Sequence, residues 1–269
     1  MDQSNPVEQE SPGSERIHKA LARAGHGSRR ALERKIAEGR VRVNGHVAQQ
    51  GCKVVPGDRI QIDGGRTFQI KPAVSGVRVL AYNKPAGVVC TRKDPEKRPN
   101  VFQHLPRLTN GRWINIGRLD INTSGLLLFT THGELAHRLM HPSYRVDREY
   151  AARVYGRVAE DALQRLRDGV TIDGEEHRFD DLVAGRGEGS NQWYYCLLQR
   201  GQNREVRRLW EAVGAQVSRL SRVRFANVML PTDLRAGRFV ELGGTLLEEL
   251  CNLVGLEQRS GKEKRPVHF

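Results

Sequence analysis

The sequence predicts an α+β protein that consists of a small N-terminal unit and a larger unit built on a mixed, largely antiparallel sheet. Segments with the apolar patterns of strands outnumber segments with helical periodicity, and the two kinds do not alternate strictly as they would in a doubly wound fold. The stretch KPAVSGV contains a linker at 73–77. We expect the units to span 15–72 and 78–255, with a disordered tail at 1–14 and a basic tail at 256–269.

The first unit begins with two short helices. RIHKALARAG and SRRALERKIAEGR both place apolar residues at helical spacing, and a glycine follows each pattern. Ser28 stands where an N-cap would start the second helix. VRVNGHVA then has the pattern of two strands joined by an Asn-Gly turn, and VVPGDRIQID that of a turn and a further strand. A pair of helices followed by a small β-ribbon is therefore expected.

The second unit carries the remaining periodic segments. The strand patterns are VRVLAYNK, GLLLFT, REYAARVYGRV, NQWYYCLLQR and VSRLSRVRFANVML. The helical patterns are GELAHRLMH, EDALQRLRDGV, REVRRLWEAVG and TLLEELCNLVG. Thr131 and Glu134 have the spacing of a capping box before the first of these helices. GRGEGS at 185–190 is expected to form a loop, and the consecutive aromatic residues Trp193, Tyr194 and Tyr195 must divide between the two faces of their strand.

The charge of the chain indicates its partner class. The formal net charge is +13 and the pI is about 10.1, with lysine and arginine scattered throughout. This excess favours a polyanion, above all nucleic acid, although a solvated basic surface without a partner has the same composition. No apolar run approaches the roughly 18 residues of a membrane span, and the cysteines form no C-x-x-C pair. We expect a reduced, soluble, cytoplasmic protein with no metal site and no membrane association.

One acidic residue has a position typical of catalytic residues. In GRLDINTSGLLLFT, Asp120 follows a strand pattern, lies in a polar loop and precedes an apolar strand. An aspartate that closes its own turn, or that pairs with Arg118, would give the same pattern. No phosphate-binding loop or nucleophile elbow is present, and His137 and His141 lack the glutamate of a metalloprotease helix.

The first unit resembles the S4 RNA-binding domain in the order helix, GxxSRR, helix, VxVNGxxA and PGDxI. The resemblance implies that this unit binds structured RNA through its helical face. Arg29 and Arg30 open the second helix, where cations and free backbone N–H groups can hold phosphate together. The residues expected to contact RNA from this unit are Arg16, Lys19, Arg23, Arg29 and Arg30.

The second unit resembles the RsuA/RluB family of rRNA pseudouridine synthases through ordered motifs. These are NKPAG at 83–87, GRLDINTSGLLLFT at 117–130, REYAARV at 148–154 and GQNREVRRL at 201–209. The resemblance implies that Asp120 is the catalytic acid, that Tyr150 is the active-site tyrosine and that Arg207 pairs with Asp120. It also implies that the protein isomerises uridine to pseudouridine without a cofactor. The residues expected to contact RNA from this unit are Lys84, Arg118, Asn203, Arg204 and Arg208.

The same segments indicate a branch of the family. CTRKDPEKRP, NQWYY and the stretch 203–224 are most similar to enzymes that modify large-subunit rRNA. The expected partner is therefore 23S rRNA or a large-subunit assembly intermediate, bound by a monomer. Two alternatives stay open: an enzyme of the same family that acts on 16S rRNA, and a non-catalytic RNA-binding or ribosome-assembly factor with an S4 domain.

Overall fold

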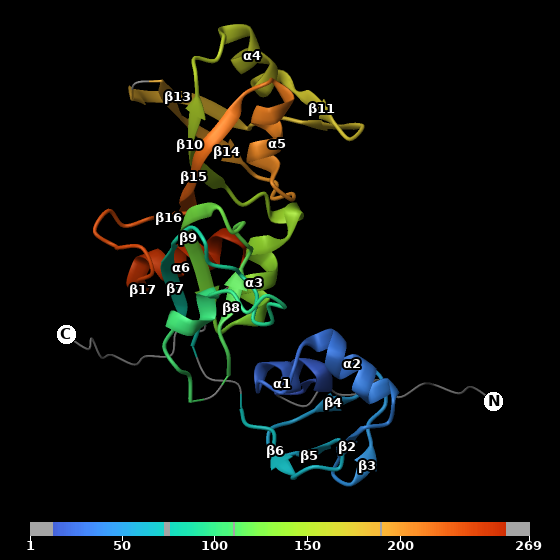
Figure 1. Ribbon diagram of the computed structural model, residues 1–269. Coiled ribbons are helices and arrows are strands. Elements are labelled where there is room, and N and C mark those ends of the chain that lie inside the picture. Colours follow the sequence, from blue (N-terminus) through green and yellow to red (C-terminus); the bar gives the residue numbers. More distant parts are fainter. Residues whose placement is uncertain (1–12, 73–75, 110, 189, 257–269) are drawn as a thin grey trace. The chain divides into compact units, whose positions relative to one another are not determined.

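The computed structural model describes residues 13–72, 76–109, 111–188 and 190–256 (Figure 1). The chain forms two compact units. The first contains the residues up to Ser75 together with Leu108–Arg112, and the second contains Gly76–Arg107 and the chain from Trp113 onward. The expected tails, apart from a few residues, and most of the expected linker lie outside the described residues.

The first unit has the two helices and the β-ribbon that its sequence predicts. Its elements are β1 (Glu15–Arg16), α1 (Ile17–Arg23), α2 (Arg29–Ala37), β2 (Val41–Val43), β3 (His46–Val47), β4 (Lys53–Val54), β5 (Arg59–Ile62) and β6 (Phe68–Gln69). Ser28 caps α2 by accepting a hydrogen bond from the backbone N–H of Ala31 at 3.1 Å. Asn44 and Gly45 both have positive φ, as a two-residue hairpin turn requires. The strand order is β3-β2-β5-β6, and β1 pairs with β4.

The second unit is built on one mixed sheet with the order β13-β14-β10-β15-β9-β7-β17. Its strands are β7 (Val79–Lys84), β8 (Ile114–Ile116), β9 (Thr123–Thr130), β10 (Arg148–Tyr155), β13 (Asp181–Glu188), β14 (Asn191–Leu198), β15 (Gln216–Phe225), β16 (Val228–Met229) and β17 (Phe239–Leu242). β8 pairs with β9, and β16 pairs with β15. Among the described residues, β9 and β15 are the only parallel pair of strands, and they join two antiparallel halves.

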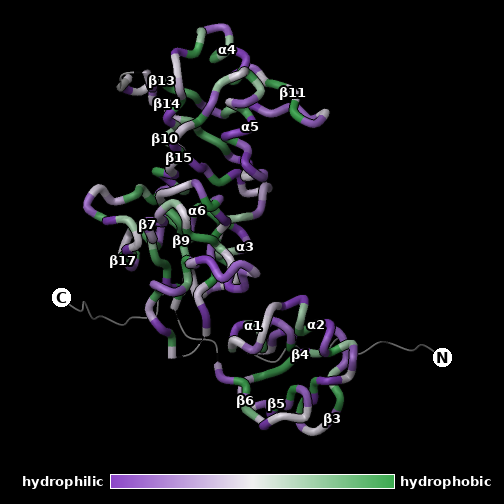
Figure 2. Tube along the Cα trace, viewed as in Figure 1, coloured by the Kyte–Doolittle hydropathy of each residue, from purple (hydrophilic) through white to green (hydrophobic). Residues whose placement is uncertain are grey.

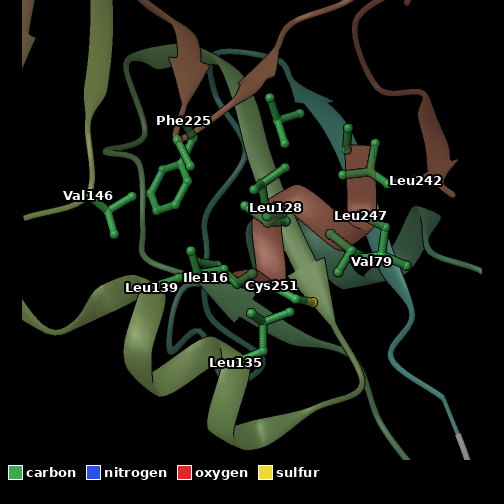
Figure 3. Close-up of a cluster of buried hydrophobic side chains, with 14 of the residues drawn as sticks. Val79, Ile116, Leu128, Leu135, Leu139, Val146, Phe225, Leu242, Leu247 and Cys251 are labelled. Atoms are coloured by element: carbon green, nitrogen blue, oxygen red, sulfur yellow. The ribbon is translucent and has the colours of Figure 1, made fainter. Parts of the chain in front are cut away.

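Helices cover one face of each half of this sheet. They are α3 (Gly133–Met140), α4 (Glu160–Asp168), α5 (Glu205–Ala212) and α6 (Gly244–Leu253), and the short elements are η1 (Val101–His104), η2 (Pro142–Tyr144), β11 (Val170–Ile172) and β12 (Glu175–His177). α3 and α6 pack on Leu128 of β9 in one core (Figure 3). α4 and α5 pack on Leu220 of β15 in a second core. In Figure 2, β9 and α6 are among the most hydrophobic parts of the chain.

The two cores lie in the two halves of the sheet, which meet at β9 and β15. Phe225 of β15 belongs to the core of α3 and α6, whereas Leu220 of the same strand belongs to the core of α4 and α5.

Two local expectations were wrong. His132, rather than Thr131, caps α3, because its Nδ1 accepts a hydrogen bond from the N–H of Leu135 at 3.2 Å. GRGEGS does not form a loop throughout, because β13 extends to Glu188. β13 keeps its antiparallel pairing with β14 through a register irregularity between Ala184 and Gly187, which lets glycines continue the strand.

The close contact between β9 and β15 requires a glycine. Gly125 has a φ of +98°, which L side chains rarely adopt. A Cβ atom on Gly125 would lie 2.3 Å from the carbonyl oxygen and 2.7 Å from the amide nitrogen of Arg222. Any side chain at this position would therefore push the two halves of the sheet apart.

We expect Gly125→Ala to lower the free energy of unfolding by about 3 kcal/mol or more, because backbone strain and a steric clash add together. Gly156→Ala is the matched control, since Gly156 also has positive φ (+79°) but has nothing within 4 Å of the added Cβ. We expect the control to lose only about 1 kcal/mol. Chemical denaturation of both variants measures the difference, and equal losses would contradict the steric argument.

Candidate active site

Asp120 lies on a short loop between two paired strands. β8 ends at Ile116 and β9 begins at Thr123, and the two strands pair with each other. The backbone N–H of Thr123 donates to the carbonyl oxygen of Asp120 at 3.0 Å, which closes the turn. The Asp120 side chain is half-buried. No described residue donates a hydrogen bond to its carboxylate or forms an ion pair with it, so its oxygens are available to a substrate.

Lys84 holds this loop in place through hydrogen bonds to its backbone. It is the last residue of β7, and its side chain has no solvent exposure. Its ammonium group donates to the carbonyl oxygens of Thr123 at 2.8 Å, Asp120 at 3.1 Å and Ile121 at 3.4 Å, and also to that of Pro85 at 3.0 Å. Burial lowers the pKa of Lys84, whereas the nearby Asp120 raises it. The expectation that Lys84 contacts RNA is wrong, because the ammonium group is enclosed by backbone carbonyls.

The rest of the NKPAG motif also supports the loop. The N–H of Gly87 donates to the carbonyl oxygen of Ile121 at 2.7 Å. The thiol of Cys90 lies 3.3 Å from the carbonyl oxygen of Leu119, within hydrogen-bond distance for sulfur. On the other side of the turn, the Asn83 side chain donates to the carbonyl oxygen of Leu234 at 2.7 Å. The motif therefore fixes the position of the Asp120 loop through hydrogen bonds to the loop backbone.

Arg207 connects the loop to the other half of the sheet. Its guanidinium group donates to the carbonyl oxygen of Val217 in β15 at 2.9 Å and to that of Asn122 in the loop at 3.2 Å. Burial lowers the pKa of Arg207, and the positive charge of Arg204 lowers it further, while Asp120 acts in the opposite direction. Within the described residues no ion pair joins Arg207 to Asp120. The two charges are close enough to interact, but their direct pairing stays a prediction.

Tyr150 lies on β10, opposite Arg222 of β15 and Cys196 of β14. Its half-buried ring packs against the core formed with α4 and α5, on the face that α5 covers. Because Arg207 belongs to α5, both residues approach the site from the same side of the sheet. No described residue forms a hydrogen bond with the Tyr150 hydroxyl.

The GQNREVRRL motif forms the turn that starts α5. Arg204 adopts the left-handed conformation with a φ of 51°, and it and Asn203 are exposed. Glu205 is buried. One of its oxygens accepts a hydrogen bond from the N–H of Gln202 at 3.0 Å, and the other lies 3.3 Å from Nδ1 of the buried His177. Arg208 pairs with Asp173.

Two buried arginines that the sequence did not indicate lie behind the site. Arg222 donates to the carbonyl oxygen of Leu126 at 2.7 Å, and its Nη2 has no hydrogen-bond partner among the described residues. Arg148 donates to the carbonyl oxygen of Gln199 at 2.6 Å. Their guanidinium carbons lie 5.0 Å and 5.3 Å from the centre of the Phe225 ring. An arginine inside a strand pattern gives no sign of burial, so these residues, like the His177–Glu205 pair, carried no sequence signal.

The residues of the first unit expected to contact RNA lie on or beside its two helices. Burial lowers the pKa of His18 on α1; Glu33 raises it, and Arg29, Arg16 and Lys19 lower it further, because these three cations lie near His18. Arg16, Lys19, Arg29 and Arg30 are exposed. Arg23 differs from them, because it pairs with Glu15 and donates to the carbonyl oxygens of Lys71 and Pro72, so it ties the ends of the unit together.

The described residues contain neither a metal-binding cluster nor a membrane-spanning helix. In the described part of the chain, no group of three or more His, Cys, Asp or Glu side chains is placed to hold a metal ion. His137 and His141 are exposed, with ring centres 5.3 Å apart. Also among these residues, no helix combines the length and the apolar character needed to cross a bilayer. Arg118 is exposed beside the loop, where it is available to solvent or a ligand.

Comparison with known proteins agrees with this geometry. The model of the RNA pseudouridylate synthase family matches residues 78–212, and that of the S4 domain matches residues 15–60. A protein of Pseudomonas aeruginosa named ribosomal large subunit pseudouridine synthase B is 55% identical over 91% of this chain, which spans 64% of that protein. A protein of the same name from Salmonella typhi is 54% identical over 90% of this chain and 84% of its own length.

A solved structure has the same fold. The crystal structure of a pseudouridylate synthase superposes with a TM-score of 0.60 at 23% identity, covering 88% of this chain and 99% of that one. The family match spans the Asp120 loop, the Tyr150 strand and the start of α5, and the relatives extend the likeness over most of the chain. The protein therefore belongs to the RNA pseudouridylate synthase family and carries an S4 domain at its N-terminal end.

Proposed function

We propose that the protein isomerises a specific uridine of 23S rRNA to pseudouridine, with Asp120 as the catalytic aspartate. The observation that carries this proposal is a carboxylate without a partner among the described residues, on a loop that Lys84 and Arg207 hold from two sides. The relatives named as large-subunit pseudouridine synthases support the choice of rRNA.

The reaction explains why a single free carboxylate is needed. The N1–C1′ bond of uridine breaks, the base turns, and a new bond forms between C5 and C1′; C5 loses its proton and N1 gains one, so the product is an isomer of uridine. Asp120 can attack C1′ as a nucleophile or remove the C2′ proton, and both routes need an unprotonated oxygen within reach of the ribose. The uridine must first leave its stack, at a cost of a few kcal/mol that RNA contacts elsewhere offset.

We assign supporting roles to Arg207 and Tyr150. Arg207 places a positive charge near the carboxylate while its hydrogen bonds go to the backbone, so the carboxylate oxygens stay unoccupied. The free hydroxyl and partly exposed ring of Tyr150 suit contact with the flipped base, near C5. Arg118, Asn203 and Arg204 are exposed at the site and suit contacts with phosphate.

We also propose that the two units have separate functions. Residues 15–72 bind RNA through Arg16, Lys19, Arg29 and Arg30, and residues 78–255 catalyse. The protein acts as a monomer in the cytoplasm, on 23S rRNA or on a large-subunit precursor. An enzyme specific for 16S rRNA and a non-catalytic assembly factor are the competing functions, and the first experiment separates them.

Asp120→Asn should abolish turnover while the affinity for RNA stays within a few-fold, because the amide keeps the shape of the side chain but removes the base and nucleophile. Tritium release from 23S and 16S transcripts labelled with 5-³H-uridine, and from unmodified large-subunit precursors, measures the reaction. Release by the wild type from 16S RNA alone would show that 16S rRNA, and not 23S rRNA, is the substrate. No release from any RNA, with tight binding, would support the assembly factor.

Lys84→Met should lower the free energy of unfolding by about 2–4 kcal/mol, because it leaves several buried carbonyl groups without a donor. Turnover should also fall at temperatures where the variant stays folded, since the Asp120 loop loses its support. The exposed Lys93 provides the control, and Lys93→Met should change stability by less than about 0.5 kcal/mol. Denaturation and tritium release test both variants. Wild-type stability in Lys84→Met would contradict the support that we assign to Lys84.

Replacing Arg29 and Arg30 together with alanine should weaken RNA binding and flatten its salt dependence. Each lost phosphate contact changes the slope of log K against log salt concentration by about 0.7–0.9. Binding titrations at several salt concentrations measure the slope, and Arg34→Ala, farther along the same helix, shows the effect of removing one positive charge elsewhere on that helix. A slope equal to that of the wild type would place the RNA contact elsewhere.

A further inference from the structure

One face of the β10-β13-β14-β15 half of the sheet is left open. The side chains of Ala152, Tyr194 and Leu220 point to the face that α4 and α5 cover. Arg153, Val183, Trp193, Tyr195, Arg219 and Ser221 alternate with these residues along the same strands and point to the other face, and none of the six belongs to a hydrophobic core cluster of the described residues. Figure 1 shows these strands with α4 and α5 beside them.

The pairing register brings aromatic and basic residues together on this open face. Trp193 of β14 stands opposite Arg153 of β10, which stands opposite Arg219 of β15. In the next row, Val183 of β13 stands opposite Tyr195, and Tyr195 stands opposite Ala151. Directly opposing residues in antiparallel strands have their side chains on the same face, so each row forms a continuous strip across the sheet.

These side chains reach solvent although they are large. Tyr195 is 45% exposed, and Val183, on the edge strand β13, is 52% exposed. Small residues flank Tyr195: Ala151 stands opposite it on β10, and Gly185 lies close to its ring, where an added Cβ would approach the ring to 3.1 Å. The result is a shallow surface with ring faces and edges accessible from outside. We call this surface, formed by Arg153, Val183, Trp193, Tyr195, Arg219 and Ser221, the open sheet face.

Its charge favours an anionic partner. Arg219 is exposed and has no hydrogen bond or ion pair with any described residue. Arg153 donates to the hydroxyl of Ser218 at 3.1 Å and has no acidic partner among the described residues. The nearest acid on the same strand, Glu149, is already paired with Arg224. The open sheet face therefore presents cations that no described residue neutralises.

We propose that the open sheet face binds single-stranded RNA, by stacking bases on Trp193 and Tyr195 and by contacting phosphates with Arg153 and Arg219. This inference rests on the proposed function only in that the protein already acts on RNA. Aromatic residues on an exposed sheet, flanked by arginines, provide the two contacts that unpaired nucleotides offer: ring faces for the bases and cations for the backbone. The surface lies on the face opposite to the one that carries Tyr150, so it contacts RNA outside the reacting uridine.

Trp193 provides a local reporter of this binding. The chain has three tryptophans, of which Trp113 and Trp210 are buried, with exposures of 5% and 0%, whereas Trp193 is partly exposed. The probe is a single-stranded RNA of about 12 nucleotides that contains only A and C, so it offers no uridine to the active site. We expect it to quench the fluorescence of the full-length protein, and we expect Trp193→Phe to remove this quenching.

Substitutions on the surface should weaken the binding that this signal reports. Tyr195→Ala should raise the dissociation constant about five- to hundredfold through the loss of one stacked base. Arg219→Gln should weaken it and reduce the salt slope by about 0.7. The matched controls are Tyr144→Ala, an exposed tyrosine outside this surface, and Arg165→Gln, on α4 behind the sheet; both should retain wild-type binding.

The outcomes separate this inference from the proposed function. Trp193-dependent quenching without tritium release from any rRNA would support the open sheet face and refute the isomerase. Tritium release without quenching would support the isomerase and refute RNA binding by the open sheet face. If quenching is absent but Tyr195→Ala and Arg219→Gln weaken association with large-subunit particles, the surface binds a protein and the RNA proposal is wrong. Equal effects of the surface variants and their controls would also overturn it.

Discussion

The close approach of β9 to β15 at Gly125 is the constraint on which the catalytic unit depends. This contact joins two antiparallel halves, each of which packs against its own helices. The Asp120 loop leads directly into β9, and Arg207 bonds both to that loop and to the carbonyl oxygen of Val217 in β15. The distance between the two halves therefore sets the distance between the carboxylate and the residues around it. A Cβ at position 125 would change all of these distances together.

The cations near Asp120 bond to the backbone and not to its carboxylate. Lys84, Arg207 and Arg222 all donate to main-chain carbonyl oxygens in or beside the start of β9. Had they paired with the carboxylate, its oxygens would have been occupied. Because the three cations bond to the backbone instead, they hold the loop in place and supply positive potential. The carboxylate oxygens stay available to the substrate. The arrangement has an energetic cost, because burial of these groups lowers the pKa of Lys84 and of Arg207.

Features that depend on neighbouring residues could be predicted from the sequence. The Ser28 cap, the Asn44-Gly45 turn and the apolar strand after Asp120 each follow from a few consecutive residues, and all are confirmed. Features that depend on distant partners could not. Lysine is usually exposed, so only the fold shows that Lys84 meets carbonyl groups about 36 residues away. The glycines of β13 continue a strand only because β14 pairs with them, and His177 meets Glu205 across a hairpin.

The parallel pairing of β9 and β15 also bears on synthesis and folding. Its paired residues, such as Leu220 and Thr123, lie 97 residues apart in the chain. Contacts of such long range form late, since the loop between them must be ordered first. The S4 unit, whose contacts are local, emerges from the ribosome well before β15 does. A growing chain would thus acquire its RNA-binding helices first and its reaction centre only near the end of translation.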